Sequence, residues 1–138
     1  MSMLFNLVNK RLNIRIVRNL VTTMADKIVN IDEVEKVAND NNVWIVDVRE
    51  PDEVKSSGLI GKSINIPLGT VKDVLKDSSS EAFQNNYGRP KPEANSPLIF
   101  YCMKGGRAAK AAELAESLGF KNAKYYQGSW TEWSSKHS

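Results

Sequence analysis

Apolar residues follow two alternating patterns along the chain from Asn30 onward. Residues 43–48, VWIVDV, form a run rich in β-branched side chains, which is typical of a strand buried on both faces of a parallel sheet. Before this run, Asn30 and Glu33 have the spacing of a capping box. The apolar residues after Asn30 recur with helical spacing, at Ile31, Val34, Val37 and Ala38. This part of the sequence therefore predicts a short helix followed by a buried strand.

The same alternation continues to the C-terminus. Shorter apolar runs predict three more strands, at residues 64–66, 98–101 and 123–126. Helical patterns begin between and after them, at Thr70, Glu81, Ala108 and Ser129. The last helix is expected to be capped by Ser129, and Pro51 is expected to act as a stop signal after the first strand. The sequence thus predicts an α/β fold with a mainly parallel central sheet flanked by helices.

Length and composition predict a single globular domain. A chain of 138 residues can bury one hydrophobic core but is short for two domains of typical size. Its 41% hydrophobic and 25% charged residues are typical of a soluble globular protein rather than a disordered or fibrous one.

The basic character of the protein comes from its first 25 residues. This segment contains four basic residues and no acidic ones, namely Lys10, Arg11, Arg15 and Arg18. From Asp26 onward the chain has 15 basic and 16 acidic residues, so it is close to neutral. A nucleic-acid partner is therefore not expected.

Residues 1–25 also have the pattern of an amphipathic helix, with apolar residues recurring every four positions from Val8 to Leu20. Their charges interrupt any run long enough to span a membrane or to form a signal-peptide core. An Arg-rich, acid-free amphipathic start is typical of a mitochondrial transit peptide. The alternative interpretation is a solvated helix or basic tail. Translation from Met24 would produce the domain without this segment, in the cytoplasm.

Cys102, the only cysteine, follows the strand predicted at residues 98–101. A single cysteine excludes an intramolecular disulfide and favours a reducing, intracellular compartment. Because a glycine-containing loop and then a helix follow, backbone N–H groups are expected to converge near the thiol and lower its pKa. Gly105 and Gly106 are expected to let this backbone fold inward without a Cβ clash. The alternative interpretation of Cys102 is a small buried apolar residue.

The segment CMKGGR, residues 102–107, resembles the C-x-x-G-x-R active-site loop of the rhodanese family. Residues 47–67, DVREPDEVKSSGLIGKSINIP, and residues 125–133, YYQGSWTEW, resemble two further motifs of that family in the same order. The resemblance runs from about Ile28 to Trp133, is greatest to small single-domain thiosulfate sulfurtransferases, and implies a rhodanese domain over residues 28–136. One departure is Leu59, where the family often has histidine.

The resemblance implies a sulfurtransferase that works in two steps. Cys102 takes the sulfane sulfur of a donor such as thiosulfate as a persulfide and passes it to glutathione, a protein thiol or cyanide. Backbone N–H groups from Met103 to Arg107 would hold the persulfide, and Lys104 and Arg107 would bind the donor. The resemblance implies no cofactor.

Asp47 and Arg49 match a pair at the end of a strand in the family. We interpret them as residues that support the active-site loop, and a structural ion pair is an equally good interpretation.

Four alternatives to sulfur transfer can be compared with the sequence. Phosphatases and arsenate reductases with a related loop use C-x-x-x-x-x-R, whereas four residues separate Cys102 from Arg107, which favours sulfur over a larger oxyanion. A cysteine hydrolase needs a histidine base, and the only histidine is His137 in the C-terminal tail. One cysteine and one histidine are too few for a typical metal site. A non-catalytic sulfur carrier, loaded by a partner protein, stays open as an alternative.

Overall fold

A computed structural model describes residues 26–138 of the chain. The predictions made for residues 1–25, including the transit peptide, lie outside the described residues. No helix within residues 26–138 combines the length and the apolar character needed to cross a membrane.

The centre of the molecule is a five-stranded sheet in which every neighbouring pair of strands is parallel. The strands are β1 (Ile28–Val29), β2 (Trp44–Asp47), β3 (Ile64–Asn65), β4 (Leu98–Tyr101) and β5 (Ala123–Tyr126). They lie in the order β1-β5-β4-β2-β3. The predicted α/β fold with a parallel sheet is confirmed, and β1 is the strand that the sequence pattern did not predict.

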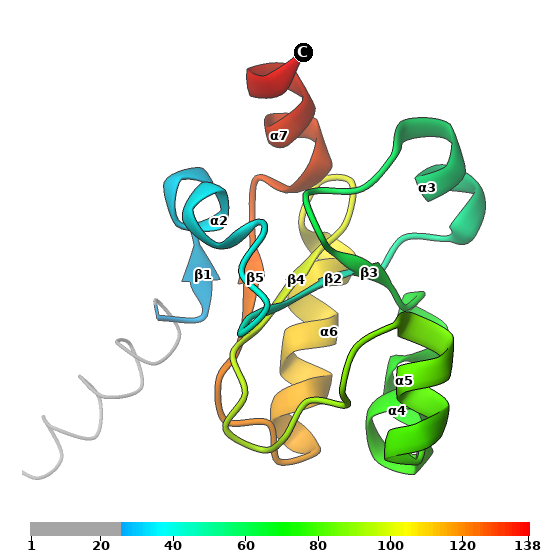
Figure 1. Cartoon of the computed structure of the whole chain (residues 1–138). Helices are drawn as coiled ribbons and strands as arrows, with labels where there is room; N and C mark the ends of the chain where they lie inside the picture. The colour runs from blue at the N-terminus through cyan, green and yellow to red at the C-terminus, as the bar shows by residue number, and fades with distance from the viewer. Residues whose placement is uncertain (1–25) are drawn as a thin grey trace, which may run out of the picture.

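Within residues 26–138, six helices pack around this sheet: α2 (Ile31–Val37), α3 (Pro51–Ser57), α4 (Leu68–Asp77), α5 (Ser80–Tyr87), α6 (Gly106–Ser117) and α7 (Ser129–His137). Figure 1 shows α2 and α7 on one side of the sheet and α4, α5 and α6 on the other. Helix α3 was not predicted, because Pro51 was interpreted as a stop signal. Pro51 instead begins α3, where its missing N–H costs nothing, and the Glu53 carboxylate accepts a hydrogen bond from the backbone N–H of Glu50.

Two apolar clusters, one on each face of the sheet, form the core. Leu98 and Phe100 of β4 belong to the cluster beneath α4, α5 and α6, whereas Ile99 and Tyr101 belong to the cluster beneath α2 and α7. Alternate residues of a strand point to opposite faces, so a continuous apolar run is needed where both faces are covered. The small side chains of α6 that face the sheet are all buried: Ala108, Ala111, Ala112 and Ala115.

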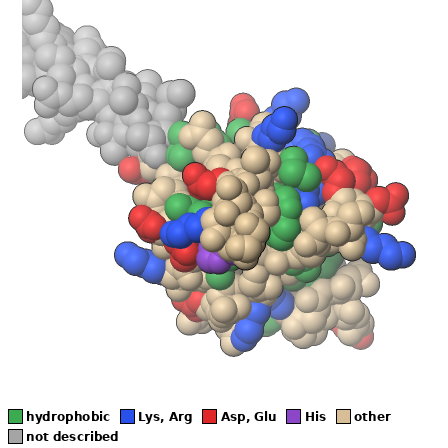
Figure 2. All heavy atoms as spheres, turned by 90° about the horizontal axis from the view of Figure 1, so that it is seen from above, with side chains coloured by type: hydrophobic (Ala, Val, Ile, Leu, Met, Phe, Trp, Pro, Cys, Tyr) green, Lys and Arg blue, Asp and Glu red, His purple; other side chains and the backbone are tan. Residues whose placement is uncertain are grey.

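All five strands end at the same edge of the sheet because they run parallel. Ligands of open parallel sheets bind outside this edge, where the strands lead into their helices. The loop between β4 and α6 and the turn between β5 and α7 both lie there (Figure 1). Figure 2 views the molecule from this end and shows basic and acidic side chains interspersed rather than one large patch of a single sign.

Candidate active site

Cys102 lies directly after β4, with its side chain at the base of the loop that leads into α6. The residue is 1% exposed, and its Sγ accepts a hydrogen bond of 3.0 Å from the backbone N–H of Gly105. Burial raises the pKa of the thiol, but hydrogen bonds from the N–H groups of Ala108, Gly105 and Lys104 outweigh it, and the pKa lies below its usual value. The N–H groups that converge on the thiol thus lower its pKa, as the sequence predicted.

The two glycines of the loop have different roles. Gly105 has a φ of 109°, and a Cβ atom there would lie 2.6 Å from the carbonyl oxygen of Gln127. A Cβ at Gly106 would meet nothing within 4 Å. The prediction that glycine avoids a Cβ clash is therefore correct for Gly105 and wrong for Gly106, because Gly106 already belongs to the open first turn of α6.

Ser129 contacts the backbone of Cys102 instead of capping α7. Its Oγ accepts a hydrogen bond of 3.1 Å from the N–H of Cys102 and donates one of 2.8 Å to the carbonyl oxygen of Tyr126. The N-cap of α7 is Gly128, and Ser129 makes no capping hydrogen bond. The predicted cap is thus wrong, because the buried N–H of Cys102 needs a partner and the Ser129 hydroxyl supplies it. The sequence signal was the position of Ser129 inside YYQGSWTEW.

Backbone N–H groups in the first turn of α7 also donate hydrogen bonds to the carbonyl oxygens of the first two loop residues. The N–H of Trp130 donates to the carbonyl oxygen of Cys102 at 2.9 Å, and the N–H of Thr131 donates to that of Met103 at 3.0 Å. The first N–H groups of a helix have no partner within the helix. Here they fix the active-site loop, so α7 is part of the site although it lies far from Cys102 in sequence.

Asp47 and Arg49 form an ion pair in which both side chains are fully buried, with 2.7 Å between Nη2 and Oδ2. Arg49 also donates to the Ser57 hydroxyl at 2.9 Å, and its guanidinium lies 5.0 Å from the ring centroid of Trp130. The pair therefore connects β2 with α3 and with the helix that holds the loop. Neither residue is among those that line the cavity at Cys102, and their support of the loop stays a proposal.

Cys102 lines a cavity of about 480 Å³ between α3 and α6. Glu53 lines it from α3. The other lining residues come from the loop and the first turns of α6: Cys102, Met103, Lys104, Gly106, Arg107 and Lys110. The structure thus brings together the predicted loop residues, and it adds Glu53 and Lys110, which sequence reasoning did not single out. Glu53 belongs to the motif of residues 47–67, but only the fold shows that α3 brings it beside α6.

The arginine of the loop is already paired with an acid. Arg107 donates two hydrogen bonds to the Glu53 carboxylate, at 2.7 and 3.0 Å. Hydrogen bonding from Arg107, together with the N–H of Glu50, lowers the pKa of Glu53 to about 2. Neither Lys104 nor Lys110 forms an ion pair within residues 26–138. The positive charge that is not offset in this cavity therefore comes from the two lysines.

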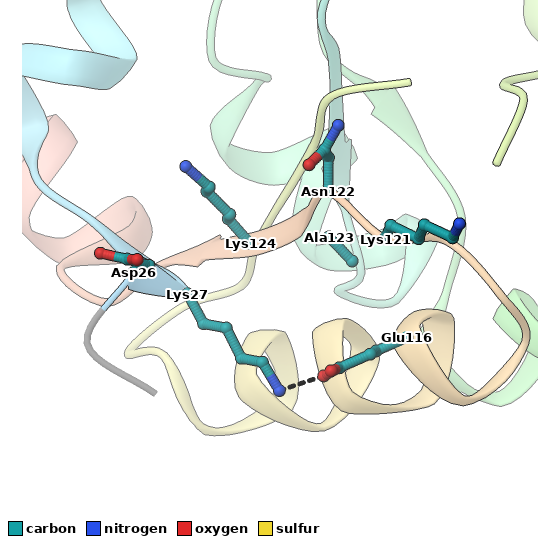
Figure 3. A pocket seen from close by; sticks show the side chains of 7 residues that line it. All are labelled: Asp26, Lys27, Glu116, Lys121, Asn122, Ala123 and Lys124. Carbon is teal, nitrogen blue, oxygen red and sulfur yellow. Dashed lines mark hydrogen bonds and ion pairs between the residues drawn. The ribbon is translucent and has the colours of Figure 1, made fainter. Parts of the chain in front are cut away.

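A second pocket, of about 290 Å³, lies at the opposite end of α6, near the start of β5. Figure 3 shows its lining side chains and the ion pair between Lys27 and Glu116 that closes one side. No cysteine, serine or threonine of residues 26–138 lines it. Among the described residues there is also no group of three or more His, Cys, Asp or Glu side chains that could hold a metal ion. The cavity at Cys102 is therefore the candidate active site.

Comparison with known proteins identifies the family. The family described as "Rhodanese-like domain" matches residues 30–136. The chain belongs to the rhodanese-like family. The resemblance expected from three sequence motifs is thereby confirmed.

Relatives and solved structures agree with this assignment. The chain is 42% identical to the mitochondrial thiosulfate sulfurtransferase RDL2 of Saccharomyces cerevisiae, over 83% of this chain and 77% of that protein. It is 41% identical to the thiosulfate:glutathione sulfurtransferase of the same yeast, over 69% of this chain and 67% of that protein. The structure of the human single-domain sulfurtransferase TSTD1 matches with a TM-score of 0.73 and 30% identity, over 81% of this chain and 98% of the human one.

Proposed function

We propose that this rhodanese-like protein is a thiosulfate sulfurtransferase whose Cys102 carries the sulfur. The Cys102 thiolate attacks the outer sulfur of thiosulfate, the sulfur–sulfur bond of the donor breaks, and sulfite leaves with the bonding electron pair. The observation that carries this proposal is the Sγ of Cys102 held by backbone N–H groups at the base of an open cavity. Such preorganised donors stabilise negative charge on the cysteine, its persulfide and the departing anion.

In the second step an acceptor thiolate attacks the outer sulfur of the Cys102 persulfide. The acceptor becomes a persulfide, and the bonding pair returns to Cys102 as a thiolate. Since Cys102 is the only cysteine, the acceptor comes from outside the chain. We propose glutathione as an acceptor, which is supported by the relative named thiosulfate:glutathione sulfurtransferase. A protein thiol or, in an assay, cyanide would react in the same way.

Lys104 is proposed to attract the thiosulfate dianion, with Arg107 contributing less because Glu53 offsets its charge. The change Lys104→Glu is expected to lower kcat/KM for thiosulfate on the order of tenfold at low salt, because attraction becomes repulsion. Raising the salt concentration should reduce this difference. The measurement is sulfite release over a series of thiosulfate concentrations, with Lys121→Glu as a control at the far end of α6. An equal loss in both variants would argue against a local role for Lys104.

We also propose that residues 1–25 direct the protein to mitochondria. The support is their acid-free, Arg-rich sequence and the mitochondrial relative RDL2. A reporter fused to residues 1–25 is expected to enter mitochondria, and changing Arg11, Arg15 and Arg18 to Glu should keep it in the cytosol. Fluorescence microscopy with a mitochondrial marker measures this. A cytosolic signal from the unmodified fusion would instead favour the cytoplasmic alternative.

A further inference from the structure

Lys110 lines the cavity of Cys102, and the donor step proposed above assigns it no role. It lies three residues after Arg107, so both side chains lie on the same face of α6 and both line the cavity. Lys110 is exposed and forms no ion pair in the part of the chain that the structure describes. A cation in this position is available to a ligand larger than the sulfur donor.

We propose that Lys110 determines specificity for the sulfur acceptor, by binding a carboxylate of a thiol that enters the cavity. The proposal rests on the function proposed above and goes beyond it by assigning the residue that recognises the acceptor. The acceptor is a thiol whose carboxylate lies several bonds from its sulfur. A short thiol without such a carboxylate would reach Cys102 but would not contact Lys110.

The position of Lys110 separates it from the donor step. Three residues of α-helix advance about 4.5 Å along the axis, so Lys110 lies almost one turn beyond Arg107, away from the sulfur of Cys102. The charged oxygens of thiosulfate lie only two bonds from the outer sulfur that reacts, so the loop N–H groups and Lys104 lie nearer to them. A peptide-sized thiol with its sulfur at Cys102 extends outward past Arg107 and reaches the first turns of α6.

The charges of the cavity favour a carboxylate over a cationic group at this place. Arg107 is held by two hydrogen bonds from its guanidinium to Glu53, and the pKa of about 2 keeps that carboxylate charged at neutral pH. The charge of Glu53 is therefore paired with Arg107 and does not neutralise the charge of Lys110. An anionic group in the cavity can therefore interact with two cations that are unpaired within residues 26–138, Lys104 of the loop and Lys110 of α6.

The test compares glutathione with its diethyl ester, which has the same thiol and peptide frame but no carboxylate charge. Steady-state kinetics with thiosulfate as donor give a separate kcat/KM for each acceptor, because sulfur transfer occurs in two independent steps. In Lys110→Gln, the ratio of kcat/KM for glutathione to that for the diester is expected to fall about fivefold, the effect of one exposed charge pair. Lys110→Arg should keep most of the wild-type ratio, and Lys121→Gln serves as the control.

Each outcome of this comparison decides for or against the proposal. An unchanged ratio in Lys110→Gln, or an equal fall with both thiols, would overturn it, because Lys110 would then not contact a carboxylate. Transfer to cyanide without transfer to glutathione in the wild type would overturn it as well. Failure of the proposed function has a different signature, since the wild type would then release no sulfite from thiosulfate with any acceptor.

Discussion

Changing Cys102 to serine is expected to reduce sulfur transfer on the order of 1000-fold or more, because a serine hydroxyl cannot form a persulfide. Serine is close to cysteine in size, and its Oγ can accept the hydrogen bond that the N–H of Gly105 now donates to Sγ. The fold should therefore remain intact. Sulfite release from thiosulfate measures the first effect, and thermal unfolding followed by circular dichroism measures the second.

The combination of the two readouts makes this variant informative. Loss of transfer together with a large fall in the unfolding temperature would leave the chemical role of Cys102 unproven. In that case Cys102→Ala provides a second test, since it removes the nucleophile without placing a hydroxyl in a buried site. Turnover close to wild type in either variant would contradict the assignment of Cys102 as the sulfur carrier.

Changing Gly105 to alanine is expected to lower sulfur transfer roughly 100-fold, the cost of displacing catalytic groups by about 1 Å. The new Cβ would lie 2.6 Å from the carbonyl oxygen of Gln127, and the φ of 109° is unfavourable for alanine. The loop or the turn before α7 must therefore move, and the N–H groups around Sγ move with it. Sulfite release and the unfolding temperature should both fall.

Gly106→Ala is the matched comparison, with the same atom added one residue later. Space is open at Gly106, and alanine is favourable in the first turn of α6. This variant is expected to lose far less transfer than Gly105→Ala. Equal losses in the two variants would show that the loop does not depend on the left-handed conformation of Gly105.

Local sequence patterns were sufficient to predict the elements that build the loop. The apolar run at residues 98–101, the small side chains of α6 and the cysteine between them predicted a strand, a loop and a helix in the observed order. These features depend on neighbours in the sequence. Strand β1 was missed because it has only two residues and is held by pairing with β5, where Ile28 lies beside Tyr125.

The missed parts of the candidate site depend on contacts between distant segments. Ser129 meets Cys102 because β5 and β4 are neighbours in the sheet, and Glu53 meets Arg107 because α3 follows the strand on the other side of β4. Neither contact leaves a periodic pattern in the sequence. A motif can show that such residues belong to the site, but their partners follow only from the fold.

The most direct test of the central claim is the intact mass of the protein before and after incubation with thiosulfate, and again after glutathione is added. We expect the wild type to gain the mass of one sulfur atom with thiosulfate and to lose it with glutathione, whereas Cys102→Ser should gain none. Repeated turnover with limiting protein would separate an enzyme from a sulfur carrier loaded by a partner protein. No mass gain in the wild type, or an equal gain in Cys102→Ser, would contradict a persulfide on Cys102.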